Sequence, residues 1–296
     1  MANKLRRFVA DIPIMRLLLK PIWRLSKSIG WFIRSTLLKN VPLTIRCGSQ
    51  AFKLYPAGQI PELIWHSDFE EGEREFIFRY IQPGMCVVNI GANVGLYTLM
   101  ASTLVGPSGK VYAFEPSSIT FERLRRNIEV NGARHVIAER VALSDQPGKV
   151  LLRSDRGHPL LDGHRFVDFS ACRATVASPG DEWVDCTTLD AAFLNHSRSA
   201  QLRPLDLIII DVEGSELAVL RGAATMLAQS PNLTILIECS QNRSEVGKLL
   251  ENYGMEFFLW EQWAGRLQPC SFVEQASVGT VIAQRPRSSM KATILA

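Results

Sequence analysis

The sequence predicts an α/β fold with a mostly parallel, doubly wound sheet and an antiparallel hairpin at its C-terminal edge. Three observations support this prediction. From about residue 84 onward, short apolar runs alternate with segments of helical periodicity, and glycine, proline or asparagine stand at the junctions. The short runs are apolar at nearly every position, which is typical of parallel strands covered on both faces. Near the C-terminus two further runs are joined by a loop alone, which favours antiparallel pairing.

The first 40 residues differ from the rest of the chain in charge. They hold nine basic residues and one acidic residue, Asp11, so residues 1–40 carry +8 and the remainder carries −4. From Pro21 onward, apolar side chains recur at helical spacing, and basic side chains gather on another face. We therefore expect a basic amphipathic segment. Its basic residues are Lys4, Arg6, Arg7, Arg16, Lys20, Arg24, Lys27, Arg34 and Lys39.

Residues 41–83 are expected to form small strands and a helix that lead into the main domain. Residues 43–45 and 52–54 alternate apolar and polar side chains, as short strands do. Residues 72–81 have helical periodicity, and the Pro-Gly pair that follows would stop a helix there.

The main domain is predicted to cover residues 84–296. Its parallel strands are expected at residues 86–90, 110–114, 136–143, 207–210 and 233–237. The expected helices are one that ends at Val105, one that carries Phe121, Leu124 and Ile128, one that carries Leu217, Leu220 and Leu227, and one at residues 244–253. Strand-helix-strand units of this kind require right-handed crossovers and a doubly wound sheet.

Two parts of this domain depart from the regular alternation. Residues 146–187 are polar and rich in glycine, proline and aspartate, so we interpret them as an insertion, in which residues 150–152 and 183–184 would pair as a hairpin. Residues 255–259 and 277–283 are the two closing strands, expected to pair antiparallel at the edge of the sheet.

Polar residues follow the predicted strands, where an open α/β sheet binds its ligand. The turn after the first strand has the spacing Gly-x-x-x-Gly, from Gly91 to Gly95, with Asn93 between them. The two glycines allow a tight turn and a close approach of a cofactor to the backbone. The third glycine of a dinucleotide fingerprint, which brings a pyrophosphate to the helix, is missing, and S-adenosylmethionine (SAM) has no pyrophosphate. Such a turn can also be purely structural.

Glu115 ends the second strand, about 20 residues beyond the glycine turn. An acid at this place can accept hydrogen bonds from two ribose hydroxyls of a nucleoside cofactor. The alternative is an acid that stabilises the helix after Pro116 through the helix dipole.

Four blocks of the sequence form a further pattern. They are residues 88–97, residues 111–116, residues 187–190, and residues 210–216 together with 220–223. In this order they resemble the blocks of FkbM-type methyltransferases. The resemblance covers about residues 70 to 240 and implies a Rossmann-like class I methyltransferase fold, SAM as the methyl donor, and transfer to a hydroxyl oxygen of a sugar, lipid or polyketide-like substrate. It also matches Asp145 to a position near the adenine, although Asp145 can equally be a turn residue before Pro147.

The chain departs from the family pattern at two positions. Asn89 stands where the family more often has aspartate, a position that commonly helps to hold the ammonium group of SAM, and asparagine can accept that hydrogen bond only without charge. Ile209 stands where the family often has lysine. These departures motivate an alternative function, a catalytically weak SAM-binding protein of the same fold. An NAD-linked oxidoreductase is a third hypothesis.

Asp211 and Glu213, which follow the fourth strand, are the predicted catalytic residues. Methyl transfer requires alignment of the acceptor oxygen and removal of its proton, and a carboxylate at this place can serve as base or as substrate clamp. Glu213 can equally be an acid at a helix start. Glu238, which ends the fifth strand, and His66 with Asp68 before the domain are weaker candidates.

The remaining expectations concern partners and location. The cysteines and histidines show no metal-ligand spacing, so no metal is expected, and the basic residues gather away from the predicted cleft, which disfavours a nucleic-acid substrate. Basic residues interrupt the apolar runs near the N-terminus, which argues against a membrane span, and no secretory signal is recognised. We therefore expect a cytoplasmic protein that is attached to an anionic membrane surface by residues 1–40. The expected apolar contacts are Ile22, Leu25, Trp31, Phe32 and Ile33. The alternative is that this segment forms a helix packed on the domain.

Overall fold

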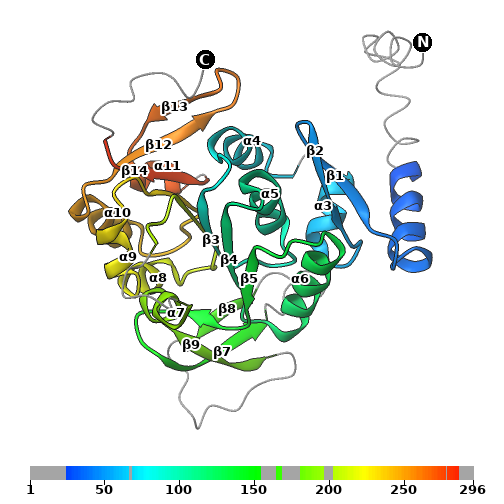
Figure 1. The fold of residues 1–296 in the computed structure, drawn as a ribbon, viewed down its shortest axis with the longest axis horizontal. Coiled ribbons are helices and arrows are strands. Elements are labelled where there is room, and N and C mark those ends of the chain that lie inside the picture. Colours follow the sequence, from blue (N-terminus) through cyan, green and yellow to red (C-terminus); the bar gives the residue numbers. More distant parts are fainter. Residues whose placement is uncertain are drawn as a thin grey trace.

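The computed structural model describes residues 25–66, 69–154, 165–168, 181–196, 203–277 and 279–286. Within them it has an eight-stranded sheet, a four-stranded sheet and a two-stranded hairpin, with helices around the large sheet (Figure 1). The large sheet consists of β3 (Cys86–Ile90), β4 (Lys110–Phe114), β5 (Val136–Glu139), β10 (Leu207–Ile210), β11 (Thr234–Ile237), β12 (Glu256–Glu261), β13 (Arg266–Pro269) and β14 (Val281–Gln284).

The strand order of the large sheet is β13-β12-β14-β11-β10-β3-β4-β5. The five strands from β11 to β5 are parallel, and β14, β12 and β13 add antiparallel pairs at one end. This confirms the predicted mostly parallel, doubly wound sheet. The chain leaves β3 toward β4 on one side and later returns to β10 on the other, so the strand order reverses at β3. Ligands bind at such a reversal in open α/β sheets.

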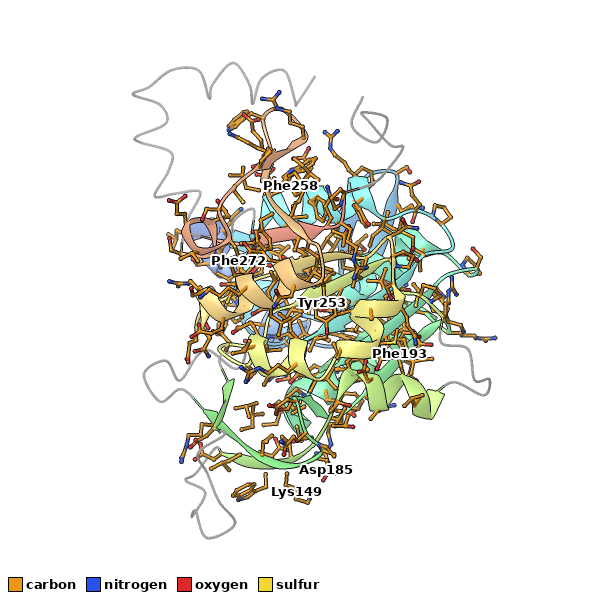
Figure 2. The ribbon with its side chains drawn as sticks, turned by 90° about the vertical axis from the view of Figure 1, so that its left-hand side faces the viewer. Lys149, Asp185, Phe193, Tyr253, Phe258 and Phe272 are labelled. Atoms are coloured by element: carbon orange, nitrogen blue, oxygen red, sulfur yellow. The ribbon has the colours of Figure 1, made fainter. Side chains whose placement is uncertain are left out.

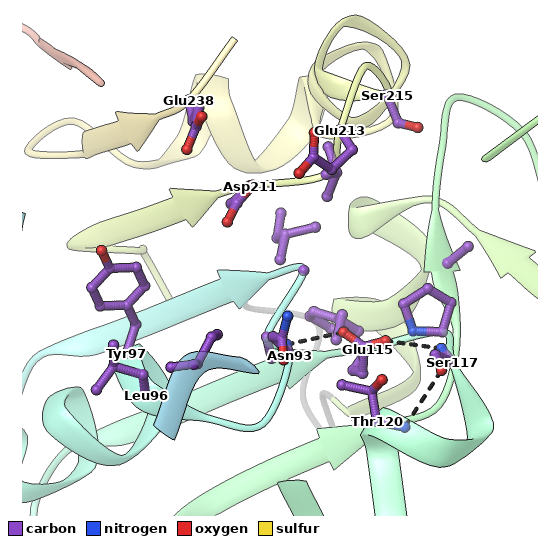
Figure 3. Close-up of a pocket in the computed structure, with 18 of the residues that line it drawn as sticks. Asn93, Leu96, Tyr97, Glu115, Ser117, Thr120, Asp211, Glu213, Ser215 and Glu238 are labelled. Atoms are coloured by element: carbon purple, nitrogen blue, oxygen red, sulfur yellow. Dashed lines mark hydrogen bonds between the residues drawn. The ribbon is translucent and has the colours of Figure 1, made fainter. Parts of the chain in front are cut away.

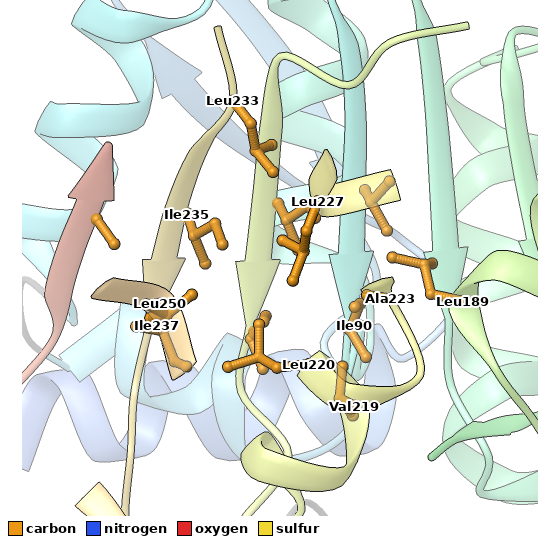
Figure 4. Close-up of a cluster of buried hydrophobic side chains, with 14 of the residues drawn as sticks. Ile90, Leu189, Val219, Leu220, Ala223, Leu227, Leu233, Ile235, Ile237 and Leu250 are labelled. Carbon is orange, nitrogen blue, oxygen red and sulfur yellow. The ribbon is translucent and has the colours of Figure 1, made fainter. Parts of the chain in front are cut away.

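The parallel strands are buried on both faces because their side chains alternate between two cores. Ile90 and Ile210 point to a core under the helices α7 (Leu189–His196), α8 (Glu216–Arg221), α9 (Ala224–Gln229), α10 (Arg243–Asn252) and α11 (Phe272–Ala276), as Figure 4 shows for α8 to α10. Val87 and Ile209 point to the opposite core, which α4 (Glu71–Tyr80) and α5 (Leu96–Val105) cover, and α6 (Ser118–Val130) packs beside them.

The segment before the large sheet contributes to the second core. β1 (Leu43–Cys47) and β2 (Gln50–Leu54) form an antiparallel hairpin, and Phe52 and Leu54 pack with Phe76 and Leu99. The helix at residues 72–81 is confirmed as α4, but α3 (Gln59–His66) was not predicted. Pro61 lies in the first turn of α3, where the missing N–H costs no intrahelical hydrogen bond.

The N-terminal helix covers residues 25–32 and continues into a π-helical turn, η1 (Ile33–Leu37). It lies beside the β1–β2 hairpin and α3 (Figure 1). Trp31 is 8% exposed and packs on Trp65 of α3, with ring centroids 6.4 Å apart. The expectation that Trp31 joins the exposed apolar face was therefore wrong, while Ile22 lies outside the described residues.

The insertion contributes most of the four-stranded sheet, whose order is β6-β9-β7-β8. Its strands are β6 (Ala142–Leu143), β7 (Gly148–Ser154), β8 (Arg165–Asp168) and β9 (Glu182–Thr187). Val150 pairs with Val184 and Leu151 with Trp183, which confirms the antiparallel pairing predicted there. On the outer surface of this pair, Lys149 Nζ lies 2.9 Å from an Asp185 carboxylate oxygen (Figure 2).

Three predicted elements differ in the structure. The strand expected at residues 136–143 divides into β5 and β6, which belong to different sheets. Arg140 lies between them, outside both strands, and its guanidinium pairs with Glu182 of β9 in the four-stranded sheet. The helix expected from Leu217 to Leu227 divides into α8 and α9 at Gly222, where a Cβ would lie 1.9 Å from the carbonyl oxygen of Ser144. Another chain segment therefore approaches the backbone closely at the point where the helix is interrupted.

The C-terminal edge is also more elaborate than predicted. The closing strands β12 and β14 do pair antiparallel, but β13 and α11 lie between them in the chain, and β13 forms the edge of the sheet. A tight turn that ends at Gly265, with φ of 60°, allows the additional strand. No helix in the described part of the chain is long and apolar enough to cross a bilayer.

Candidate active site

A cavity of about 270 Å³ opens at the carboxyl ends of the central strands (Figure 3). Its lining includes the ends of β3, β4, β10 and β11, the turn into α5, part of α3, and residues of β6, β7 and β8. The cavity therefore lies at the reversal of strand order, and the four-stranded sheet covers one of its sides.

The glycine turn forms the floor of the cavity. Gly91 and Asn93 line it, and both have positive φ, at 79° and 49°. A Cβ on Gly91 would lie 1.7 Å from the backbone oxygen of Asp211, so only glycine lets β3 and β10 approach this closely. Gly95 does not line the cavity. Its φ is 98°, and a Cβ there would lie 2.6 Å from Leu124, so it permits close packing of α5 and α6.

Glu115 lies at one end of the cavity and is 7% exposed. Its Oε2 accepts the N–H of Asn93 at 2.9 Å, and its Oε1 accepts the N–H of Ser117 at 2.9 Å. These two bonds fix the carboxylate between the glycine turn and the start of α6, where Ser117 Oγ also accepts the N–H of Thr120. A carboxylate has about four acceptor sites, so further donors from a ligand can be accommodated.

Four carboxylates line the other end of the cavity. Asp211 and Glu213 follow β10, Glu238 follows β11, and Glu70 precedes α4 (Figure 3 shows the first three). Tyr97 of α5, which also lines the cavity, donates its hydroxyl proton to Glu70. Four carboxyl groups are thus gathered in a partly buried space, and a cation placed among them would favour their ionised forms.

The pKa values of two of these carboxyls are displaced upward. Burial raises the pKa of Glu70 to about 7, with contributions from Glu73 and Glu238, against the opposing effects of the Tyr97 hydrogen bond and Arg74. Burial also raises the pKa of Asp211 well above its usual range. The acids that add to this second shift are Glu238, Glu213, Glu70 and Glu216. A raised pKa makes a carboxylate a stronger base whenever it is ionised, and a cation bound nearby would favour the ionised form.

The loop after β10 brings Glu213 and Ser215 to the cavity. Glu213 has φ of 49° and Gly214 φ of 102°, and the buried Glu216 holds this conformation by accepting the N–H of Gly214 at 2.8 Å. Left-handed backbone at a residue other than glycine is typical of constrained functional loops. Ser215 is buried, and its Oγ has no hydrogen-bond partner among the described residues. A ligand hydroxyl could satisfy it.

The structure does not bring every predicted residue to the cavity. Asn89 is buried outside the lining, and its Nδ2 donates to Thr98 Oγ1 at 2.9 Å. Asp145 is exposed and accepts a hydrogen bond from Ser144, in agreement with its alternative as a turn residue. His66 lies on α3 next to Trp31 and also lies outside the lining, and Asp68 is outside the described residues.

Several lining residues were not identified from the sequence. Tyr97 lies within the first of the four blocks, and Ser117 directly follows the second. Their position next to predicted site residues could have identified both as lining residues. Glu70, Ile60 and Leu63 come from the segment before the sheet, where no local pattern indicated a ligand site. Only the packing of α3 and α4 against α5 and the sheet places them there.

The remaining blocks meet beside the cavity. The carboxylate of Asp190 accepts the N–H groups of Thr225 and Met226 at 2.8 and 2.9 Å, which caps the start of α9. Its own N–H donates to the carbonyl of Gly222 at 3.1 Å. Gly222 in turn contacts Ser144, directly after β6, whose two residues line the cavity. These residues therefore support one wall of the site.

Comparisons with known proteins agree with this geometry. A family model described as the methyltransferase FkbM domain matches residues 89–268. The 31-O-demethyl-FK506 methyltransferase FkbM of Streptomyces tacrolimicus is 37% identical over 187 residues, which cover 51% of this chain and 69% of that protein. The hexuronic acid methyltransferase AglP of Haloferax volcanii is 28% identical over 197 residues, 65% of this chain and 73% of that protein.

Among solved structures, a SAM-dependent O-methyltransferase from Thermotoga maritima aligns with a TM-score of 0.38 and 12% identity, over 84% of this chain and 79% of that chain. The family model, by contrast, spans more than half of the sequence and includes the glycine turn, Glu115 and both carboxylates after β10. The chain therefore belongs to the FkbM methyltransferase family.

Proposed function

We propose that this protein transfers a methyl group from SAM to a hydroxyl oxygen of a small molecule, glycan or glycolipid. The observation that supports this most directly is the arrangement of one cavity, with the buried Glu115 at one end and Asp211 and Glu213 at the other. The carboxylate of Glu115 can accept hydrogen bonds from ribose hydroxyls, and the carboxylates of Asp211 and Glu213 can hold an acceptor hydroxyl and take its proton. The names of the two relatives, which refer to a hexuronic acid and to a demethylated oxygen of FK506, support an oxygen acceptor.

The residues present fit SAM. Glu115 would accept hydrogen bonds from the ribose hydroxyls, and the glycine turn at Gly91 leaves the backbone open to close approach. Phe114, Val141 and Leu143 supply an apolar wall on the Glu115 side for a nucleobase. The carboxylates at the opposite end offer negative charge for the ammonium and sulfonium groups.

When bound, SAM supplies an electrophilic methyl group. The acceptor oxygen forms the new bond to this carbon while the bond from carbon to sulfur breaks, and the hydroxyl proton must leave. We assign Asp211 to hold the acceptor and to take this proton, because it lines the cavity and its pKa is raised. Glu213 and Ser215 are placed to orient the acceptor on the same side.

A second candidate is a SAM-binding protein with little catalytic power, which the departures at Asn89 and Ile209 suggested. Both residues lie outside the cavity lining. Asn89 faces Thr98, and Ile209 is buried in the apolar core below α4 and α5. Neither departure removes a group from the wall of the cavity, so this geometry favours the enzyme.

The test measures binding and transfer separately. Calorimetry with SAM reports binding, and incubation with SAM labelled in its methyl group, together with polyhydroxylated small molecules, glycans and glycolipids, reports transfer. We expect binding and a labelled, base-stable methyl ether on one acceptor class. Binding without transfer to any of them would support the second candidate, and no binding of SAM would contradict both.

We further propose that the reaction takes place in the cytoplasm, with residues 1–40 attaching the protein peripherally to the inner face of the membrane. The net charge of +8 on this segment supports the proposal, since anionic lipids attract basic residues near the surface.

A further inference from the structure

We propose that the exposed apolar side of the N-terminal helix is a docking face for an anionic membrane, and that it presents the cavity to an acceptor carried by a lipid. The nature of the acceptor rests on the proposed function, whereas the docking itself does not. The docking face consists of Leu25, Ile29, Phe32, Ile33 and Leu37, and Leu38 and Val41, which follow the helix, are exposed apolar neighbours.

Large exposed apolar side chains are concentrated on this face. Of the twelve in the described part of the chain, seven lie within residues 25–41. Leu25, Ile29 and Phe32 are 62%, 53% and 63% exposed, and Leu37 is 72% exposed. Single exposed apolar residues are ordinary on a protein surface, but a contiguous group on one element marks an interaction site.

The opposite side of the helix is fixed to the protein. Trp31 packs on Trp65, Trp65 Nε1 donates to the carbonyl of Lys27 at 2.9 Å, and Lys27 Nζ donates to the carbonyl of His66 at 3.2 Å. A Cβ on Gly30 would lie 3.0 Å from the Trp65 ring, so the contact is close. At about 100° per residue, Leu25, Ile29 and Phe32 form one stripe, and Trp31 lies on the far side. The helix is therefore held in place with its apolar stripe outward.

The charge of the segment favours an anionic membrane over a second copy of this chain. Nine basic residues stand against Asp11 in residues 1–40, while the rest of the chain carries −4. In a dimer of this chain, the +8 segment of one copy would face the +8 segment of the other, and the two would repel each other. A helix with an exposed apolar stripe in a strongly basic segment is typical of helices that lie in the interface of an anionic bilayer.

The docking face is connected to the cavity through α3. Trp65 and His66 at the end of α3 hold the N-terminal helix, and Gln59, Ile60 and Leu63 of the same helix line the cavity. The N-terminal helix and α3 together therefore separate the outward stripe from the cavity, a distance of roughly 20 Å, or two helix diameters. A hydroxyl on an extended lipid headgroup, such as a glycan chain, would span this distance, which favours a glycolipid over a freely diffusing acceptor.

The experiment compares the full chain with two triple variants in vesicle sedimentation. Leu25→Gln/Ile29→Gln/Phe32→Gln removes the stripe, and Leu194→Gln/Trp263→Gln/Val273→Gln changes three similarly exposed apolar residues elsewhere. Vesicles contain phosphatidylcholine alone or with phosphatidylserine, at low and high salt. We expect the wild type and the control to bind the anionic vesicles at low salt, and the stripe variant to partition at least about tenfold more weakly.

Circular dichroism of all three proteins shows whether a variant has a fold defect. Calorimetric SAM affinity of the same proteins distinguishes failure of docking from failure of the proposed function. Loss of vesicle binding in the stripe variant with SAM affinity and helicity retained supports the proposal. It is overturned if the wild type does not bind anionic vesicles, if the two variants bind equally well, or if sedimentation velocity shows that the stripe instead holds a dimer together.

Discussion

At the scale of single residues, Glu115 contributes both to the fold and to the proposed cofactor site. Its two oxygens accept N–H groups that belong to the glycine turn and to the start of α6. Replacement by alanine would leave both N–H groups without this partner, at a cost of about 1–3 kcal/mol each, and would confuse loss of binding with loss of stability. Glutamine is the more informative substitution.

We expect Glu115→Gln to weaken SAM binding about ten- to a hundredfold, because the side chain loses its charge and one of its two acceptor oxygens. Isothermal titration calorimetry measures the change. Glu122→Gln, on the exposed side of α6, is the control and should bind SAM normally. Unchanged affinity in Glu115→Gln would contradict the ribose assignment.

Asp211→Asn should lower turnover by about a hundredfold or more and leave the SAM dissociation constant within a few-fold of wild type. Asparagine keeps the size of the side chain but cannot accept the acceptor proton. Steady-state rates and calorimetry on the same preparation give the two quantities. Turnover within a few-fold of wild type would mean that Asp211 is structural.

Glu70 should make stability depend on pH. Burial raises its pKa to about 7, from 4.5, so the folded chain binds more protons than the unfolded chain between these values. The free energy of unfolding should therefore fall as pH rises through this window. Glu70→Gln still offers Tyr97 an acceptor but does not titrate. It should be as stable as wild type at pH 4.5 and more stable at pH 8, by on the order of 1–3 kcal/mol.

Urea unfolding at the two pH values measures this difference. Glu71→Gln, at the exposed first residue of α4, is the matched control, and its stability should vary with pH as that of wild type does. A stability gain in Glu70→Gln that is the same at both pH values would contradict the explanation by titration.

At the scale of elements, prediction succeeded where the signal was local. The glycine turn after β3, the polar ends of β4 and β10, and helix α4 are specified by residues adjacent in the sequence. The division between α8 and α9 was missed because its cause, the contact of Gly222 with Ser144, joins residues 78 positions apart. Helix α3 was not predicted, although Pro61 suits its first turn.

The cap of α9 leads to a test at this scale. Asp190→Ala removes the acceptor of two N–H groups at the start of the helix and should lower the free energy of unfolding by about 1–2 kcal/mol. Asp185→Ala removes a carboxylate from an exposed ion pair with Lys149 and should cost less than about 1 kcal/mol. Chemical denaturation compares them, and equal losses would show that the capping bonds contribute little.

At the scale of the whole molecule, the doubly wound sheet and the position of the cavity followed from the alternation of elements. The position of Glu70 did not, because it depends on α3 and α4 packing against the sheet from a segment expected to precede the domain. Asn89 was expected near the ligand because it matches a family position that commonly helps to hold the ammonium group of SAM. Side chains alternate along a strand, however, and this one faces Thr98 in the interior.

Elements from both halves of the sheet and from the insertion line the cavity, so a ligand there should stabilise the molecule as a unit. SAM at a hundred times its dissociation constant should add about 2.7 kcal/mol, which raises the melting temperature by about 5–10 °C. Differential scanning fluorimetry measures the shift. NAD, whose pyrophosphate the turn at Gly91 is not built to hold, is the control, and an equal shift with NAD would contradict the cofactor assignment.

Docking of the outward stripe of the N-terminal helix on a membrane, as proposed, would also change the rate law. A protein held at a lipid film meets its acceptor in two dimensions, so the quantity that governs turnover is the mole fraction of acceptor in the film rather than its bulk concentration. Adding inert lipid at constant total acceptor would then slow the reaction, an effect known as surface dilution. One bound protein would modify many acceptors on a single vesicle before it moves to the next.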